Sequence, residues 1–192
     1  MFKKFLIIAW EGVKVVAISL AIIIPVRYFL IQPFYVKGAS MEPSFHDHEY
    51  LIIDEISYRF RPVVRGEVVV FRYPLNPQEY FIKRIVALPG ESVQIKDSEL
   101  IIYNDEHPGG LILEETYLDS LSPTYSNSDD KITLEDNEYY VLGDNRTASK
   151  DSRSFGPIHR SFITGRVFLR GWPLSRAAVF NEQVDYTATE SN

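Results

Sequence analysis

Two separate segments of the sequence carry residues that together could cleave a bond by nucleophilic attack. In "GASMEPSF" a hydroxyl residue, Ser40, lies between a small Gly-Ala pair and a Met-x-Pro turn. A serine hydroxyl is a weak nucleophile until a base removes its proton. Histidine is the usual base, so the four histidines are the first candidates.

The histidines give little support for a Ser-His pair or for a metal site. His46 and His48 lie in a polar loop, and no cluster of further ligand types accompanies them. His107 lies in another polar segment, which leaves His159 as the one serious histidine partner for Ser40. We expect no metal ion, and lysine is the alternative base.

Lys83 is the lysine whose surroundings indicate such a role. In "EYFIKRIVAL", strand alternation places Lys83 on the same face as Phe81, Ile85 and Ala87. Burial on an apolar face lowers the pKa of a lysine, and a neutral amine can act as a general base near pH 7. This stretch alone favours instead a lysine that reaches solvent or protects a strand edge. Arg84 faces the other way and is expected to pair with a carboxylate.

A third segment, "GDNRTASKDSRSFGP", concentrates charged and hydroxyl residues after an apolar strand. Guanidinium groups bind carboxylates through paired hydrogen bonds, so we expect a loop that bonds to itself and forms one wall of a site. Ser149 or Ser152 could orient the Lys83 amine. By residue type alone, a solvated polar loop remains an alternative.

The remaining pattern predicts a mostly β protein. Short apolar, β-branched runs separated by Gly, Pro and Asn predict a barrel-like antiparallel β domain over residues 33–180 rather than βαβ units. A polar stretch at about 105–136 is expected to leave this domain as an excursion with one short strand or turn of its own. The polar tail, 181–192, is expected to fray.

The N-terminal segment predicts one transmembrane helix. We place it at residues 15–32, because a span starting at Phe5 would bury Glu11 and Lys14. Lysines within residues 1–14 favour a cytoplasmic N-terminus, with the β domain on the outer face of the cell membrane. A cleaved secretory signal and a buried soluble helix are the alternatives.

Composition excludes several other classes of protein. The chain has 192 residues, no cysteine and a formal net charge of -6. Disulfides, thiolate metal sites and a cysteine nucleophile are therefore excluded. With no basic stripe, we expect no nucleic-acid partner, and we expect a monomer.

The three segments, in this order behind an apolar N-terminus, resemble the type I signal peptidases of bacteria, over roughly residues 12–175. The resemblance implies a fold of the signal peptidase or LexA-like type, with Ser40 as nucleophile and Lys83 as general base. Ser149 would hold the lysine amine. The resemblance further implies supporting roles for Asp144, Arg146, Asp151 and Arg153.

The same resemblance implies the reaction and its partners. The substrates would be signal peptides of exported preproteins, cleaved after small residues at -3 and -1 beside the lipid bilayer, with no cofactor. We expect the apolar subsites to be lined by Val36, Met41, Phe81 and Ile82. Gly38 replaces a hydroxyl residue that donates to the oxyanion in some members, so a main-chain donor such as the Ser40 N–H would carry more of this task.

Three other interpretations remain open at this point. A specialised Ser-Lys protease could process pilin or conjugation substrates. A self-cleaving repressor type is opposed by the anchor and by the absence of a DNA-binding half. An anchored β domain could also bind partners without catalysis.

Overall fold

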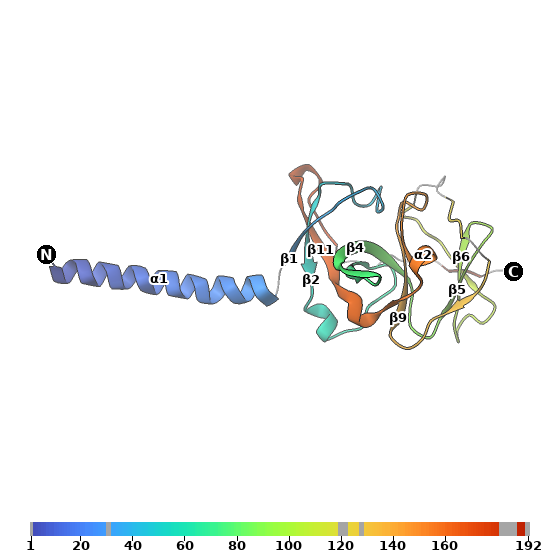
Figure 1. The fold of residues 1–192 in the computed structure, drawn as a ribbon, viewed down its shortest axis with the longest axis horizontal. Coiled ribbons are helices and arrows are strands. Elements are labelled where there is room, and N and C mark those ends of the chain that lie inside the picture. The colour runs from blue at the N-terminus through green and yellow to red at the C-terminus, as the bar shows by residue number, and fades with distance from the viewer. Residues whose placement is uncertain (1, 30–31, 119–122, 127–128, 181–187, 191–192) are drawn as a thin grey trace.

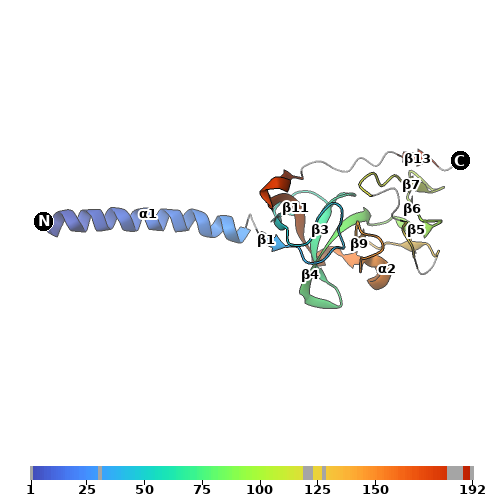
Figure 2. The same cartoon turned by 90° about the horizontal axis from the view of Figure 1, so that it is seen from above.

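The chain forms a mostly β body from which one long helix extends, with the two termini at opposite ends (Figures 1 and 2). This is a computed structural model, and it describes residues 2–29, 32–118, 123–126, 129–180 and 188–190. The helix is α1 (Phe2–Phe29). No helix in these described ranges combines the length and the apolar character needed to cross a membrane.

The helix begins well before the predicted start at residue 15. Glu11 and Lys14 were the reason for placing the start there, but they lie one turn apart and form an ion pair at 2.8 Å. This pair lets the helix continue through both charges. The predicted end at residue 32 is also displaced: α1 ends at Phe29, residues 30–31 lie outside the described residues, and a strand begins at Gln32.

The first sheet carries the segments singled out above. Its strands follow the order β1-β2-β11-β3-β4-β9-β10, with β12 paired to β11. Among the described strands this path is open, so the expected barrel-like closure is not found. The bounds are β1 (Gln32–Tyr35), β2 (Tyr50–Asp54), β3 (Val68–Tyr73), β4 (Asn76–Ala87), β9 (Glu138–Leu142), β10 (Ile158–His159), β11 (Ile163–Trp172) and β12 (Ala178–Val179).

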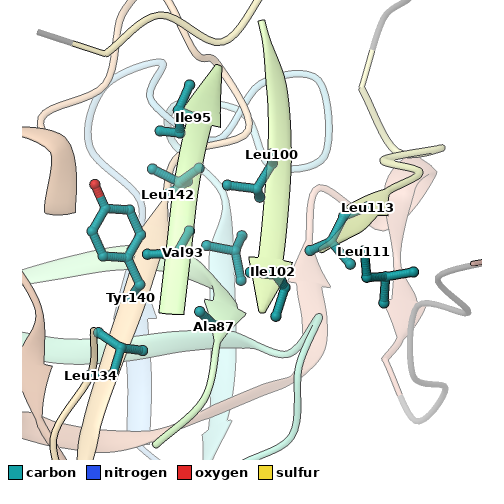
Figure 3. Close-up of a cluster of buried hydrophobic side chains, with 11 residues drawn as sticks. Ala87, Val93, Ile95, Leu100, Ile102, Leu111, Leu113, Leu134, Tyr140 and Leu142 are labelled. Carbon is teal, nitrogen blue, oxygen red and sulfur yellow. The ribbon is translucent and has the colours of Figure 1, made fainter. Parts of the chain in front are cut away.

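A second sheet packs beside the first through its own apolar core. Its order is β13-β7-β6-β5-β8. Figure 3 shows aliphatic side chains of β5 and β6 directed at Tyr140 and Leu142 of β9. The bounds are β5 (Ser92–Lys96), β6 (Glu99–Tyr103), β7 (Leu111–Leu113), β8 (Ile132–Thr133) and β13 (Ala188–Glu190).

Two expectations change here. The excursion at about 105–136 contributes two strands, β7 and β8, rather than one, and both join the second sheet. The tail was expected to fray, yet Ala188–Glu190 pairs with β7. Its other residues, 181–187 and 191–192, lie outside the described residues.

Short helices connect the strands. One of them, α2, begins immediately after Asp151, whose side chain accepts a hydrogen bond from the Arg153 N–H and caps the helix. The bounds are α2 (Ser152–Phe155), η1 (Ser57–Arg59), η2 (Arg160–Phe162) and η3 (Leu174–Arg176), where η marks a 3-10 helix.

Strand β4 has the alternation predicted for it, up to a bulge. Phe81 and Ile85 pack in one apolar cluster on the face that Lys83 shares. Between Ile85 and Ala87 the register with β9 shifts by one residue. A bulge reverses the side-chain alternation of a strand. Ala87 therefore packs in the cluster of the second sheet, although the alternation predicts it on the same face as Ile85.

Candidate active site

Ser40 lies in a turn that follows β1 and is held from two sides. The Asn145 side chain donates to the Ala39 carbonyl, and the Asn145 N–H donates to the Ser40 carbonyl, both at 3.1 Å. On the other side, the Asp47 carboxylate accepts from the Gly38 N–H at 2.9 Å. Gly38 has a φ of 85°, which a residue with a Cβ adopts only under strain. The turn is therefore fixed by side chains that the sequence analysis did not identify.

Lys83 reaches this turn from β4. Its Nζ forms a hydrogen bond with Ser40 Oγ at 2.8 Å and donates to the Ile82 carbonyl at 2.7 Å. The residue is only 3% exposed. Burial lowers the pKa of Lys83 to about 8, and the charges of Asp151 and Asp144 only partly oppose this effect. The structure thus brings together a hydroxyl and a desolvated amine that lie 43 positions apart in the sequence.

Arg84, the next residue, buries its charge on the opposite face of β4. Its Nε and one Nη donate to both carboxylate oxygens of Asp144, at 2.9 and 2.6 Å. The ring of Tyr117 lies 3.9 Å from the guanidinium carbon. The expected carboxylate partner of Arg84 is therefore Asp144, which ties β4 to the loop after β9.

Asp151 and Arg153 form the second ion pair of that loop. The Arg153 guanidinium donates to both oxygens of Asp151 at 2.8 Å, and the Gly143 N–H donates to the same carboxylate at 3.0 Å. Burial alone would raise the pKa of Asp151, but these hydrogen bonds and the Arg153 charge hold it below its usual value. The loop bonds to itself here, as its composition predicts.

Arg146 does not pair within its own loop. Its two Nη atoms donate to the two carboxylate oxygens of Glu115, and its Nε donates to the Gly143 carbonyl at 3.0 Å. It also donates to the Thr124 hydroxyl. Glu115 and Thr124 come from the excursion, where their spacing gives no sign of a role at this site. No signal in the sequence links these two residues to Arg146.

Ser149 lies against Ser40 without bonding to Lys83. A Cβ added at Gly143 would come within 2.1 Å of Ser149 Oγ and 2.5 Å of the Ser40 carbonyl, so the two turns meet over a position that only glycine can occupy. The Ser149 Oγ is buried and lies towards the Asp151 carboxylate, whose pKa it helps to lower, while the described contacts of Lys83 Nζ do not include it. The expected contact between its hydroxyl and the Lys83 amine is therefore not formed. Ser152, the other candidate, accepts instead from the Val141 N–H at 3.0 Å.

A groove of about 630 Å³ runs beside Ser40 and Lys83. Val36, Phe81 and Ile82 line it, as predicted. Met41 does not: it is 1% exposed and packs in the core cluster beneath the groove, because its side chain points inward from the turn. The groove is flanked by β1 and by the part of β4 before Arg84. Among the described strands, β1 pairs only with β2, and this part of β4 pairs only with β3.

In the described part of the chain, no histidine lines the groove or bonds to Ser40 or Lys83. His159 contacts Ser161, His48 contacts Tyr35, and His46 lies 3.4 Å from Glu42. None of these rings has a contact with Ser40. In the part of the chain that the structure describes, no group of three His, Cys, Asp or Glu residues could hold a metal ion.

Comparison with known proteins identifies the family. Residues 9–172 match the family described as "Signal peptidase, peptidase S26". A signal peptidase I of Leptolyngbya laminosa is 36% identical over 174 residues, covering 86% of this chain and 81% of that protein. Signal peptidase IB of Staphylococcus aureus is 32% identical over 176 residues, covering 86% and 90% of the two chains.

A crystal structure of a signal peptidase I from Enterococcus faecalis V583 aligns with a TM-score of 0.45 and 30% identity, over 56% of this chain and 97% of that chain. The family match spans most of the chain, and two relatives exceed 30% identity over most of their own length. The chain therefore belongs to the signal peptidase family, peptidase S26, and is a serine peptidase.

Proposed function

We propose that this chain is a membrane-anchored endopeptidase that removes signal peptides from exported preproteins, with Ser40 as nucleophile and Lys83 as general base. Membership of the signal peptidase family supports the removal of signal peptides. One observation supports the mechanism above all: the 2.8 Å contact between Ser40 Oγ and the buried Nζ of Lys83.

The geometry favours proton transfer from the serine to the lysine. With a pKa of about 8, the amine is neutral in a useful fraction of molecules near neutral pH. Lys83 in this form takes the Ser40 proton as Oγ attacks the scissile carbonyl, and it returns the proton to the departing amine. Water then attacks the acyl group on Ser40. Lys83 takes a proton from this water and returns it to the Ser40 Oγ as the acyl group departs.

Main-chain donors in the Ser40 turn would stabilise the oxyanion. The Ser40 N–H donates to no other group within the described residues, so it is available to a developing negative charge. The Gly38 N–H, in contrast, already donates to Asp47 at 2.9 Å. Asn145 holds the turn by donating to the Ala39 and Ser40 carbonyls.

The substrate would bind as an added strand. The free edges of β1 and β4 flank the groove, and an extended peptide between them can bond to both backbones. Val36 and Ile82 would then form shallow apolar subsites for the small side chains at -1 and -3. Large residues at these positions would meet the packed cluster below.

The anchoring role of α1 rests on its exposed side chains. Large apolar residues between Trp10 and Ile23 are 48% to 62% exposed and have no protein surface to cover them in the described residues. Residues 15–23 of this helix carry no charged side chain, and an uncovered apolar helix segment fits a lipid environment better than water. An anchored enzyme would meet its substrates at the same membrane.

The experiment compares cleavage of one preprotein by purified full-length variants in detergent. We expect Ser40→Ala and Lys83→Met each to lower kcat/KM by at least about 10³-fold, since each removes one half of the reacting pair. Ser175→Ala and Lys96→Met, at exposed positions outside the groove lining, serve as matched controls. Folding is checked by circular dichroism.

A non-catalytic binding module predicts a different outcome. In that case Ser40→Ala and Lys83→Met would behave like the two control variants. Retention of more than about a tenth of the wild-type rate in either folded variant would refute the proposed mechanism.

A further inference from the structure

Two lysines with no acidic partner line the substrate groove. Lys37 and Lys150 both border it, and neither ammonium forms an ion pair with a carboxylate in the described part of the chain. The one acidic residue of the lining, Glu79, accepts a hydrogen bond from Asn76 at 2.8 Å. The groove of this acidic chain, whose net charge is -6, therefore carries two positive charges without a carboxylate partner among the described residues.

Contacts place Lys150 close to the reacting pair. Its Nζ lies 4.6 Å from the centre of the Tyr73 ring. Tyr73 stacks on Phe81 with ring centres 4.5 Å apart. Phe81 in turn lies 5.4 Å from Lys83 Nζ. The Lys150 ammonium therefore sits over an aromatic surface on the Lys83 face of β4.

The face of β4 on which Lys150 lies decides which side chains of a bound peptide can contact it. Ile82 and Val36 pack in the cluster that forms the floor of the groove, while Phe81 packs in the cluster on the opposite face. Side chains of an extended peptide alternate in the same way. If those at -1 and -3 face the floor, those at -2 and +1 face Phe81 and Lys150.

We propose that Lys150 is a specificity-determining residue that favours an acidic side chain of the substrate at -2 or +1. This inference rests on the proposed function, because it needs a peptide in the groove. A carboxylate at either position would meet an ammonium that has no other acid to pair with. Tyr73 keeps the lysine stem in place, which reduces the entropy lost on binding.

The experiment measures kcat/KM for two series of otherwise identical substrates, one varied at -2 and one at +1, each with Glu, Gln or Lys. For wild type we expect Glu to exceed Gln by about two- to fivefold in at least one series, the range of a partly exposed ion pair, and Lys to fall below Gln. Raising the salt concentration should shrink these ratios because the charges are open to solvent.

Variants separate charge from packing. Lys150→Met keeps an apolar stem over Tyr73 and should abolish the Glu preference, so that kcat/KM for the Glu substrate falls to that for the Gln substrate. Lys150→Glu should reverse the preference toward Lys. Lys96→Glu makes the same change in net charge on the second sheet, outside the groove, and should leave every ratio unchanged.

Each remaining outcome is decisive. Equal rates for Glu, Gln and Lys in both series, with the Gln substrate cleaved, would overturn the role of Lys150 and leave the proposed function intact. A loss in Lys150→Met that is the same for all substrates would show that Lys150 only packs against Tyr73. Failure of wild type to cleave any substrate would reject both proposals.

Discussion

Lys83 and Arg84 are neighbours on β4 that bury a positive charge in opposite ways. Arg84 is 5% exposed and meets both oxygens of the Asp144 carboxylate. Lys83 is 3% exposed and meets a hydroxyl and a carbonyl, with no carboxylate in hydrogen-bond contact. The first arrangement keeps its charge, whereas the second makes charge costly and lowers the pKa of the amine to about 8.

The difference shows how one strand serves structure on one face and chemistry on the other. The pair of Arg84 and Asp144 ties β4 to the loop after β9, and so fixes the position of Lys83 next to Ser40. The burial that keeps the Lys83 amine reactive also destabilises the folded chain.

Removing Arg84 should be the most damaging change to stability. Arg84→Met leaves Asp144, whose side chain is fully buried, without its main partner. We expect a loss of about 3–5 kcal/mol in the free energy of unfolding, measured with urea. The double variant Arg84→Met, Asp144→Leu should recover much of this loss, because it removes both charges. A loss below about 1 kcal/mol in the single variant would contradict the contrast.

Removing Lys83 should increase the free energy of unfolding, whereas removing Arg84 decreases it. Its folded pKa is lowered to about 8, so protonation favours the unfolded chain, and the cost of burying it is fully present below that pH. Near pH 7 this cost is about 3 kcal/mol at most, at 1.36 kcal/mol per pKa unit. Lys83→Met should therefore stabilise the fold by about 1–3 kcal/mol.

The gain from Lys83→Met should shrink as the pH rises from about 8 through the unfolded pKa, because the unfolded lysine then loses its proton as well. Urea unfolding at several pH values measures it, with Lys96→Met as the exposed control. A variant less stable than wild type at neutral pH would show that Lys83 is not held at a cost.

A smaller effect is expected at Glu115. Glu115→Gln removes the charge that the buried Arg146 guanidinium faces, while a side-chain oxygen and the shape remain. We expect a loss of about 1–2 kcal/mol in unfolding free energy. Because Arg146 also holds Gly143 beneath Ser149, kcat should fall while KM changes little. An unchanged kcat would show that the excursion does not support the site.

The contrast between Lys83 and Arg84 was largely predictable from the sequence. Strand alternation put the two side chains on opposite faces, and an apolar face indicated a lowered pKa for Lys83. The partner of Arg84 could not be assigned, because Asp144 lies 60 positions away and several acids compete for it. The bulge that redirects Ala87 has no signal in the sequence.

Other elements could not be predicted for similar reasons. Glu115 reaches Arg146 across 31 positions, from a segment whose polar composition indicated only an excursion. Met41 was expected in the groove, but its side chain packs in the core cluster, a direction that the residue type does not reveal. Local pattern predicts faces and elements, whereas contacts between distant segments depend on the assembled fold.

The pH dependence of kcat/KM for a substrate without ionisable groups near the cleavage site tests the central claim most directly. Because the lysine must be neutral to accept the Ser40 proton, kcat/KM should fall about tenfold per pH unit below an inflection near the Lys83 pKa of about 8. Above the inflection it should level off. A rate that stays constant from alkaline pH down to about pH 5 would contradict a role for Lys83 as the neutral base.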